Sequence, residues 1–312
     1  MARVRAHVGQ HQNGETANFA VDPNLGWRMR PDHRFTIVEE GKPVVYAADR
    51  DGFRIDPARP PARDPRKVVA VGDSFTFGKG VEFRGSYPAL LAERLGGWQV
   101  ANLAQPGYGL DQTWQALVHE AIPRSPDLIV AGIFPEDFER SLTAFRWRER
   151  MNKPAFRLDG RDLVRLTAHD APGSLGRFIE NHSHVLALWR RATVNLGYRA
   201  GIGPMWDLNA AILDAMAAAA AEARVPIVFV HVPWRTLAPF PPLARHMDES
   251  GALFVDPRDA MRAKPPDSLY LEGDQHLNAA GHALIAAEIA RFLEGRPEVL
   301  GGAAGTSPPG PR

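Results

Sequence analysis

Cysteine is absent from all 312 residues, and the chain has no excess of one charge. Without cysteine, disulfides, thiolate catalysis and zinc sites built on cysteine are excluded. Lysine and arginine number 37 and aspartate and glutamate 36, so the net charge of +1 gives no indication of a nucleic-acid partner. The sequence implies no cofactor and no metal, and it leaves the oligomeric state open.

Long apolar runs are also absent. The first residues, MARVRAHVGQHQNGETANFA, begin basic but lack the run of roughly 7–15 apolar residues found in a signal peptide. No later segment approaches the roughly 20 apolar residues of a membrane span. We therefore expect a chain without a membrane span, located in the cytoplasm, or outside it if an N-terminal anchor is missing from this sequence.

Apolar runs of strand length alternate with helical patterns from residue 67 onward, as in βαβ units. The predicted strands are Lys67–Val71, Gln99–Leu103, Leu128–Phe134, Ile227–Val232 and Leu253–Val255. The predicted helices are Tyr87–Leu95, Asp111–Ala121, Asp207–Ala223 and Asn278–Leu293. Because most of the strands read as continuous apolar runs, they predict an α/β fold whose parallel five-stranded sheet is covered on both faces.

Two regions flank this main domain, which we place at residues 65–295. Residues 1–64 are expected to form a small β-rich extension and a linker, with strand-like pieces at Phe35–Glu39 and Pro43–Tyr46. Residues 296–312 are rich in glycine and proline and are expected to be disordered.

An insertion at about residues 139–205 follows the third predicted strand. It contains a predicted hairpin that turns at Asp159-Gly160, followed by a predicted helix near His184–Leu196. An insertion at the carboxyl end of a strand is placed to cover a ligand site, so we interpret it as lid-like.

The loop after the first strand, Gly72-Asp73-Ser74-Phe75-Thr76-Phe77-Gly78, has several possible functions. A phosphate-binding loop of Walker type is excluded, because five residues separate the glycines and Gly80 follows Lys79. An aspartyl phosphatase would need a second aspartate at position 75. The remaining alternatives are an ordinary turn and a nucleophilic Ser74 on a tight strand-to-helix turn.

A base for such a serine is available in the loop before the last helix. His276 lies there, and Asp274 two residues earlier can orient the imidazole. Both loops open at the same edge of the predicted sheet, so Ser74 and His276 can meet. The alternative is that His276 is only a polar residue at a helix start.

The other histidines give weaker indications of a functional site. His282 is expected to face the surface of the last helix or a neighbouring turn, and a metal pair at His182 and His184 would require an extended segment. Trp189, Trp206 and Trp234 are interpreted as packing residues, with the alternative that the insertion offers some of them as walls of a substrate site.

Two further loops can supply donors for an oxyanion. In the loop after the second strand, Gly107 lets a backbone N–H approach a ligand closely. The loop after the third strand contains Glu136-Asp137. Ordinary turn chemistry is the alternative for both loops.

Four motifs, GDSFTFGKGV, NLAQPGYG, the loop with Glu136-Asp137, and DQHLNAAGH, resemble in order and spacing those of the SGNH (GDSL) hydrolases. The resemblance covers about residues 67–294 and implies a flavodoxin-like three-layer sandwich. It implies Ser74 as nucleophile, His276 as base and Asp274 as the partner of the base. It also implies oxyanion donors at the backbone N–H groups of Ser74 and Gly107. We place Asp73 and Glu136 in the same oxyanion and substrate site.

The chain departs from the family pattern at two places. The aspartate lies two residues before the histidine rather than three, which is similar to the branch that acts on O-acetyl groups of bacterial polysaccharides. Glu136 stands where the family has an asparagine that donates to the oxyanion. An ionised carboxylate would oppose the oxyanion, so we expect Glu136 to be protonated or, as we prefer, to pair with Arg140 or Arg146. The segments GWRMRP and DRDGFRI are similar to the extension of membrane-tethered bacterial members.

These residues predict a serine esterase that hydrolyses carboxylic esters of small molecules or glycans. The alternatives are transfer of the acyl group to a sugar hydroxyl, and a binding protein that keeps the fold without turnover.

Overall fold

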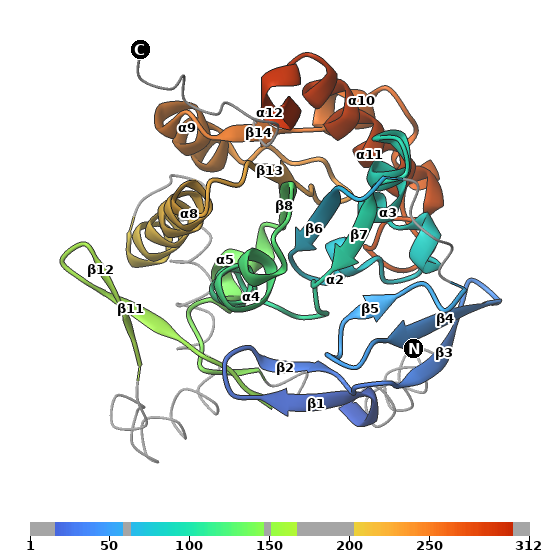
Figure 1. The fold of residues 1–312 in the computed structure, drawn as a ribbon, viewed down its shortest axis with the longest axis horizontal. Helices are drawn as coiled ribbons and strands as arrows, with labels where there is room; N and C mark the ends of the chain where they lie inside the picture. The colour runs from blue at the N-terminus through green and yellow to red at the C-terminus, as the bar shows by residue number, and fades with distance from the viewer. Residues whose placement is uncertain (1–15, 59–63, 147–150, 167–202, 302–312) are drawn as a thin grey trace, which may run out of the picture.

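An eight-stranded sheet forms the centre of the molecule, seen in a computed structural model that describes residues 16–58, 64–146, 151–166 and 203–301 (Figure 1). In spatial order the strands are β14 (Leu253–Val255), β13 (Ile227–His231), β8 (Leu128–Ile133), β6 (Lys67–Val71), β7 (Gln99–Asn102), β5 (Arg54–Ile55), β4 (Lys42–Ala48) and β3 (Arg34–Glu39). The first five strands run parallel, and the last three are antiparallel to their neighbours. The predicted parallel five-stranded sheet is therefore confirmed.

The strand bounds follow the apolar runs closely. β6 and β14 have the predicted bounds, and the predictions for β7, β8 and β13 run one residue too far. Successive residues of these strands point to opposite faces, so Ile129 enters one core and Val130 the other. A continuous apolar run is thus what a strand needs when both of its faces are covered.

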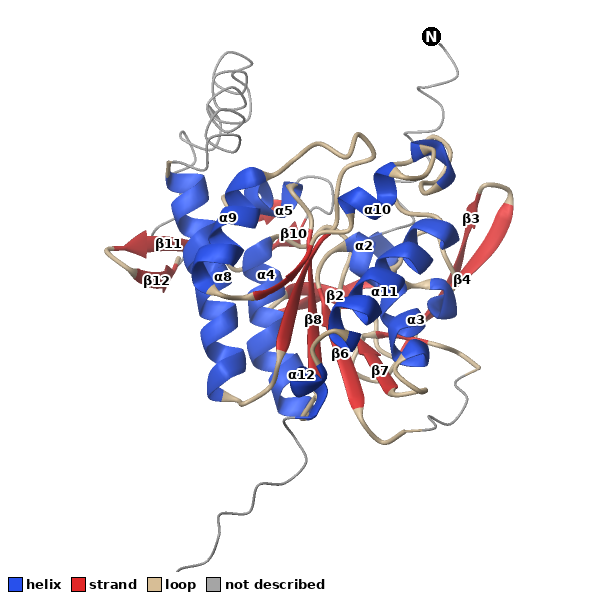
Figure 2. Ribbon diagram, turned by 90° about the horizontal axis from the view of Figure 1, so that it is seen from above, coloured by secondary structure: helices blue, strands red, loops and turns tan. Residues whose placement is uncertain are grey.

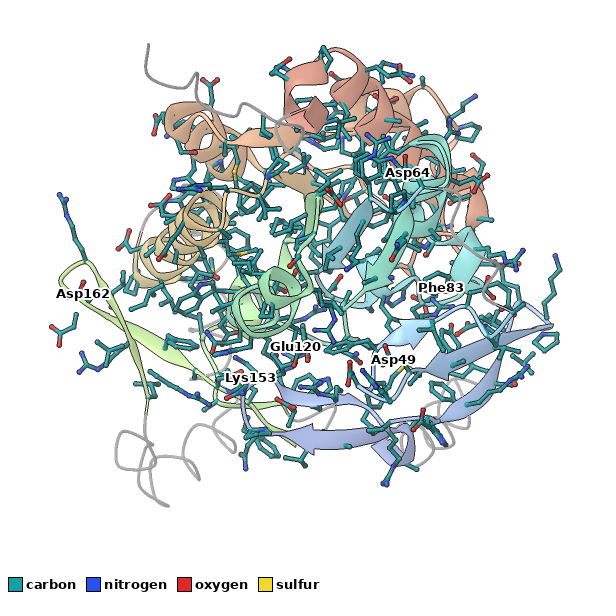
Figure 3. All side chains as sticks on the ribbon, viewed as in Figure 1. Asp49, Asp64, Phe83, Glu120, Lys153 and Asp162 are labelled. Carbon is teal, nitrogen blue, oxygen red and sulfur yellow. The ribbon has the colours of Figure 1, made fainter. Side chains whose placement is uncertain are left out.

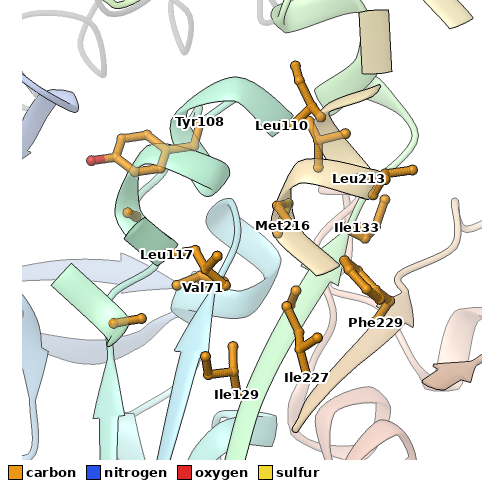
Figure 4. Close-up of a cluster of buried hydrophobic side chains, with 14 of the residues drawn as sticks. Val71, Tyr108, Leu110, Leu117, Ile129, Ile133, Leu213, Met216, Ile227 and Phe229 are labelled. Carbon is orange, nitrogen blue, oxygen red and sulfur yellow. The ribbon is translucent and has the colours of Figure 1, made fainter. Parts of the chain in front are cut away.

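Helices cover both faces and complete a three-layer sandwich (Figure 2). On one face lie α4 (Leu110–Ala116), α8 (Pro204–Glu222) and α9 (Pro241–Ser250), and on the other α3 (Tyr87–Arg94), α10 (Arg258–Arg262) and α11 (Ala279–Glu294). Sheet residues such as Val71 and Phe229 pack against Leu213 and Met216 of α8 (Figure 4). Helix α9 was not predicted, and the predicted helix Asp111–Ala121 becomes π-helical after Ala116.

The N-terminal extension is β-rich, as predicted, and it lengthens the main sheet. β3 and β4 form a hairpin, and β5 joins β7 through the single pair Arg54↔Asn102. A separate hairpin, β1 (Phe19–Asp22) and β2 (Gly26–Met29), places Trp27 in the main core at 1% exposure. The extension is therefore packed into the same body as the parallel sheet.

The described part of the insertion packs against α4 and α8. It begins at the end of α5 (Glu136–Arg140) and continues with β9 (Phe145–Arg146), β10 (Met151–Asn152), β11 (Phe156–Asp159) and β12 (Asp162–Arg165). The hairpin turns at Asp159-Gly160 as predicted. Lys153 forms an ion pair with Asp111 of α4 in which both side chains are fully buried (Figure 3). The predicted helix at 184–196 and both candidate metal histidines lie outside the described residues, and the lid interpretation stays a prediction.

The tail begins with a helix, α12 (Pro297–Gly301). The expectation of disorder is wrong for these residues, because Val299 and Leu300 pack against the core beside α11. Residues 302–312 lie outside the described residues. Among the helices of the described ranges, none is long and apolar enough to cross a membrane.

Candidate active site

Ser74 lies at the first position of a short helix, α2 (Ser74–Phe77), directly after the carboxyl end of β6 (Figure 1). Asp73 caps this helix, since its Oδ1 accepts a hydrogen bond of 2.9 Å from the Phe75 N–H. The turn requires glycine at position 72, where φ is 153° and a Cβ would lie 2.3 Å from Thr76 Oγ1. The GDS tripeptide therefore produces the tight strand-to-helix turn that the sequence predicts.

The structure brings Ser74 and His276 together, as predicted, across 202 positions of sequence. Ser74 Oγ lies 2.8 Å from His276 Nε2, and His276 Nδ1 lies 2.5 Å from Asp274 Oδ1. The same Oδ1 accepts the His276 backbone N–H at 3.1 Å. The three side chains thus form a continuous chain from hydroxyl to imidazole to carboxylate.

Neighbouring groups fix the His276 ring and the charge of its partner. The ring of Phe75 lies 4.7 Å from the imidazole, and the Nζ of Lys79 lies 3.3 Å from Asp274 Oδ2. Burial alone would raise the pKa of the Asp274 carboxyl, but the His276 hydrogen bond and the charges of His276 and Lys79 hold it well below its usual value. Asp274 is therefore ionised and able to orient the imidazole.

The loop that carries His276 is held rigidly at the start of α11. Asn278 caps that helix, because its Oδ1 accepts from the N–H groups of Ala280 and Gly281. The Asn278 Nδ2 donates to the carbonyls of Ser268 and Tyr270, which ties the loop to the segment before it. Asn278 thus starts α11 and also fixes the position of His276.

Arg140 joins the three loops that surround Ser74. Its guanidinium donates to Asp73 Oδ2 at 2.9 Å, Tyr108 O at 3.0 Å, Asp137 Oδ1 at 2.8 Å and Glu136 Oε2 at 3.0 Å. Asp73 and Tyr108 come from the β6–α2 and β7–α4 connections, and Glu136 and Asp137 from the first turn of α5, which follows β8. The sequence indicated Arg140 only as a partner for Glu136, and the contacts with Asp73 and Tyr108 join residues that are distant in sequence.

Burial of this cluster affects how its members hold their protons. Burial and the adjacent Asp73 carboxylate raise the pKa of Asp137, while Arg140 opposes the rise. Burial lowers the pKa of Arg140, but the carboxylates of Asp137, Asp73 and Glu136 together raise it above its usual value. Arg140 is therefore a permanent cation beside the Ser74 turn.

Glu136 turns toward Arg140, which is the alternative that we preferred, and its side chain is 41% exposed. Gly107 lies in the loop after β7 with φ of 81°, a conformation that glycine adopts without strain. This loop is tied to the Ser74 turn, because the Gln105 N–H donates to the carbonyl of Gly72 at 3.2 Å. The role of the Gly107 N–H as an oxyanion donor stays a prediction.

Aromatic side chains line the site beside His276. The rings of Phe75 and Phe134 lie 4.4 Å apart, and Phe134 lies 4.9 Å from the half-buried Trp234.

His282 is buried at 1% exposure, and its Nδ1 accepts the Tyr87 N–H at 3.3 Å. Of the two alternatives for His282, the helix surface is wrong, and the side chain faces the neighbouring start of α3, where Tyr87 packs over it.

Comparisons with known proteins agree with the predicted family. A sequence model of the GDSL-like lipase/acylhydrolase family matches residues 70–284. The structure is similar to a putative lipolytic protein of the G-D-S-L family from Desulfitobacterium hafniense, with 13% identity, 73% of this chain and 99% of that chain covered, and a TM-score of 0.45. It is also similar to an acetylxylan esterase from Geobacillus stearothermophilus, with 15% identity, coverage of 73% and 94%, and a TM-score of 0.43.

A third similar structure is a lipase/acylhydrolase from Enterococcus faecalis, with 16% identity, coverage of 74% and 96%, and a TM-score of 0.42. None of the curated proteins matches this sequence. The family match extends over well over half of the chain and includes the positions of Ser74 and His276. The chain therefore belongs to the GDSL-like lipase/acylhydrolase family and is a hydrolase that acts on ester bonds.

Proposed function

We propose that the chain hydrolyses carboxylic esters with Ser74 as nucleophile, His276 as general base and Asp274 as the group that orients it. Ser74 Oγ attacks the acyl carbon while its proton passes to His276 Nε2. The imidazolium then gives this proton to the leaving alcohol, and the acyl group remains on Ser74. A water molecule, deprotonated by His276, attacks the acyl-serine and releases the acid and the free serine.

One observation carries this proposal. Ser74 Oγ lies 2.8 Å from His276 Nε2, and His276 Nδ1 lies 2.5 Å from Asp274 Oδ1, although Ser74 and His276 come from opposite ends of the domain. Side-chain exposures of 14% for His276 and 30% for Asp274 leave the group within reach of substrate and water. A base in contact with its nucleophile and held by a carboxylate is the arrangement that such catalysis needs.

The negative charge that develops on the acyl oxygen also needs donors. We assign this role to the backbone N–H groups of Ser74 and Gly107, since both lie in loops that Arg140 holds together. Glu136 faces Arg140 and does not replace the family asparagine as a donor. The fixed positive charge of Arg140 offsets the carboxylates of Asp73 and Asp137 near the reacting atoms.

Labelling with a fluorophosphonate tests the proposal, because only an activated serine reacts quickly with it. Ser74→Ala should abolish labelling and lower hydrolysis of p-nitrophenyl acetate by at least ~10³-fold, with folding intact. Ser250→Ala, at the exposed end of α9, is the matched control and should label like the wild type. Unchanged turnover in purified Ser74→Ala would eliminate the mechanism.

For the substrate we propose O-acyl esters, including acetyl groups on glycans, because of the two-residue spacing between Asp274 and His276. Hydrolysis of short p-nitrophenyl acyl esters should be compared with release of acetate from acetylated glycans. Transfer to a sugar hydroxyl would instead produce a new sugar ester when a free glycan is added, and acetate release would fall. A binding protein on the same fold would give neither product and no labelling.

A further inference from the structure

The turn that follows the Ser74 helix is held by a buried arginine of the N-terminal extension. Arg54 of β5 is 1% exposed and donates to the carbonyls of Phe77 at 2.6 Å, Gly78 at 2.7 Å and Val81 at 2.5 Å. Its guanidinium also lies over the rings of Tyr46 and Phe77, at 4.5 Å and 4.9 Å from their centres. A cation at these carbonyls satisfies acceptors at the carboxyl end of α2 that the helix itself leaves open.

A second residue of the extension holds the same turn. The Tyr46 hydroxyl accepts the Gly80 N–H at 2.7 Å. The fit is tight, because a Cβ at Gly80 would lie 2.3 Å from Leu271 Cδ1, in the loop that leads to Asp274. The turn from Gly78 to Val81 is thus enclosed by the extension on one side and by the His276 loop on the other.

Lys79 lies at the centre of this turn and reaches the carboxylate that orients His276. Its Nζ is 3.3 Å from Asp274 Oδ2, while His276 occupies Oδ1. The Lys79 side chain is only 17% exposed, so this contact is partly shielded from water. Each carboxylate oxygen therefore has a donor, which fixes the rotation of the carboxyl group.

The extension also contacts the His276 loop directly. Glu40, at the tip of the β3–β4 hairpin, accepts the backbone N–H of Glu272 at 2.6 Å. Two parts of the extension thus hold the two segments that meet at Asp274.

We propose that Lys79 is a positioning residue for Asp274, and that Tyr46 and Arg54 make the N-terminal extension part of the hydrolytic site by holding the turn that carries Lys79. This inference rests on the proposed function. Lys79 acts through the carboxylate and not on the substrate, so its loss slows the chemical step without weakening substrate binding.

The test uses the full chain with p-nitrophenyl acetate as substrate. Lys79→Met should lower kcat about tenfold with KM unchanged, and it should slow fluorophosphonate labelling by the same factor. Lys79→Arg restores a cation and should recover most of kcat. Lys42→Met, which removes an exposed lysine of the same extension, is the control and should behave like the wild type.

A double-mutant cycle tests the role of the extension. Tyr46→Phe removes only the hydroxyl that accepts the Gly80 N–H and should lower kcat about threefold. In the Lys79→Met background it should have no further effect, because both changes act through the same contact. Thermal midpoints of each variant would verify that the variants are folded.

Several results would overturn the inference. Lys79→Met with wild-type kcat, or with a change in KM alone, would rule out the positioning role, as would Lys79→Arg no more active than Lys79→Met. If the decreases in kcat caused by Tyr46→Phe and Lys79→Met multiplied in the double variant, the two residues would act independently. The extension would then have no role in positioning Lys79. A wild type with neither hydrolysis nor labelling would instead overturn the proposed function, and this inference with it.

Discussion

Two groups of charged side chains flank Ser74, and they differ in their access to water. The Asp274 group contains Asp274, Lys79 and His276, with side-chain exposures of 30%, 17% and 14%. The Arg140 group contains Asp73, Arg140 and Asp137, with exposures of 1%, 11% and 0%. Each group contains a cation and a carboxylate in contact. The first group reaches the serine hydroxyl through the His276 imidazole at 2.8 Å, whereas the second reaches it only through the Asp73 carboxylate, at 3.5 Å.

This difference in exposure to water indicates different roles for the two groups. A group that exchanges protons must remain near water, and its ion pairs contribute little to stability because solvent screens them. A buried group cannot lose one partner without leaving an uncompensated charge, so it fixes its loops firmly. We therefore assign chemistry to the Asp274 group and the framework of the site to the Arg140 group.

The largest effect is expected from Asp274→Asn. Loss of the orienting carboxylate should lower kcat by about 10³- to 10⁴-fold. The reason is that asparagine no longer favours the imidazole tautomer that the reaction needs and no longer stabilises the imidazolium with a negative charge. The free energy of unfolding should change by less than about 1 kcal/mol, since the carboxylate is partly exposed. Esterase assays and urea denaturation measure the two quantities. Glu272→Gln removes a neighbouring exposed carboxylate as a control, and a greater loss in that variant would assign the orienting role to Glu272.

Arg140→Gln is expected to have its main effect on stability instead of on kcat. This change leaves the buried carboxylates of Asp73 and Asp137 without their cation, which should lower the free energy of unfolding by about 3–5 kcal/mol. Arg157→Gln breaks the exposed pair with Asp159, at 49% and 67% exposure, and should cost no more than about 1 kcal/mol. Equal losses in urea denaturation would show that the Arg140 group has no special part in stability.

The buried His282 of α11 is expected to make the stability of the protein depend on pH. Burial lowers the pKa of His282 from its usual 6.5 to about 3, with smaller contributions from the Arg54 and His276 charges. Below about pH 6.5 the unfolded chain binds a proton there that the folded protein does not bind. The free energy of unfolding should therefore fall as pH drops from about 6.5 to about 3, by up to about 1.4 kcal/mol per pH unit.

His282→Asn should flatten this slope, because asparagine can accept the Tyr87 N–H but does not titrate. Urea midpoints between about pH 7 and pH 5 would measure the slope, and His246→Asn serves as control on α9. Part of the slope should remain, because burial also lowers the pKa of His231. An unchanged slope in His282→Asn would mean that other groups cause the acid sensitivity.

The smallest effect is expected from Glu136→Gln. Glu136 is the exposed member of the Arg140 contacts, so its loss should alter turnover by no more than about threefold and add no ionisation to the pH profile. If the wild type instead lost activity as pH rose through neutrality, and Glu136→Gln abolished that loss, a protonated Glu136 would be the oxyanion donor. Rate profiles across neutral pH separate these results.

The sequence predicted the parallel sheet well because each buried strand is a continuous apolar run bounded by turn residues. β6 and β14 have the predicted bounds for this reason. Helix α9 was missed as a whole, because its Pro-rich opening and polar residues resemble a loop. The union of β5 with β7 depends on one residue pair, and nothing in the local sequence of Arg54 indicates it.

The candidate site also has parts that could be predicted from the sequence and parts that could not. Ser74 and His276 could be brought together from sequence, because loops at the carboxyl ends of parallel strands share one edge. The contacts of Arg140 with Asp73 and Tyr108, and of Lys79 with Asp274, could not be predicted, since spacing within EDFER reveals only the bonds of Arg140 to Glu136 and Asp137. Asp73 and Tyr108 lie 67 and 32 residues from Arg140, and Asp274 lies 195 from Lys79. Such contacts exist only once the whole sheet is formed.

The order of synthesis gives the N-terminal strands a further consequence. They leave the ribosome before the parallel strands, yet some of their partners are made much later in the chain. Gln112 donates to the Leu25 carbonyl across 87 positions, Tyr108 donates to the Trp27 carbonyl across 81, and Glu272 donates to Glu40 across 232. Contacts of such high sequence separation form slowly, because a long loop must close before they contribute stability. The β3–β4 hairpin therefore cannot complete its contacts until the chain has been made as far as Glu272, in the loop that carries His276.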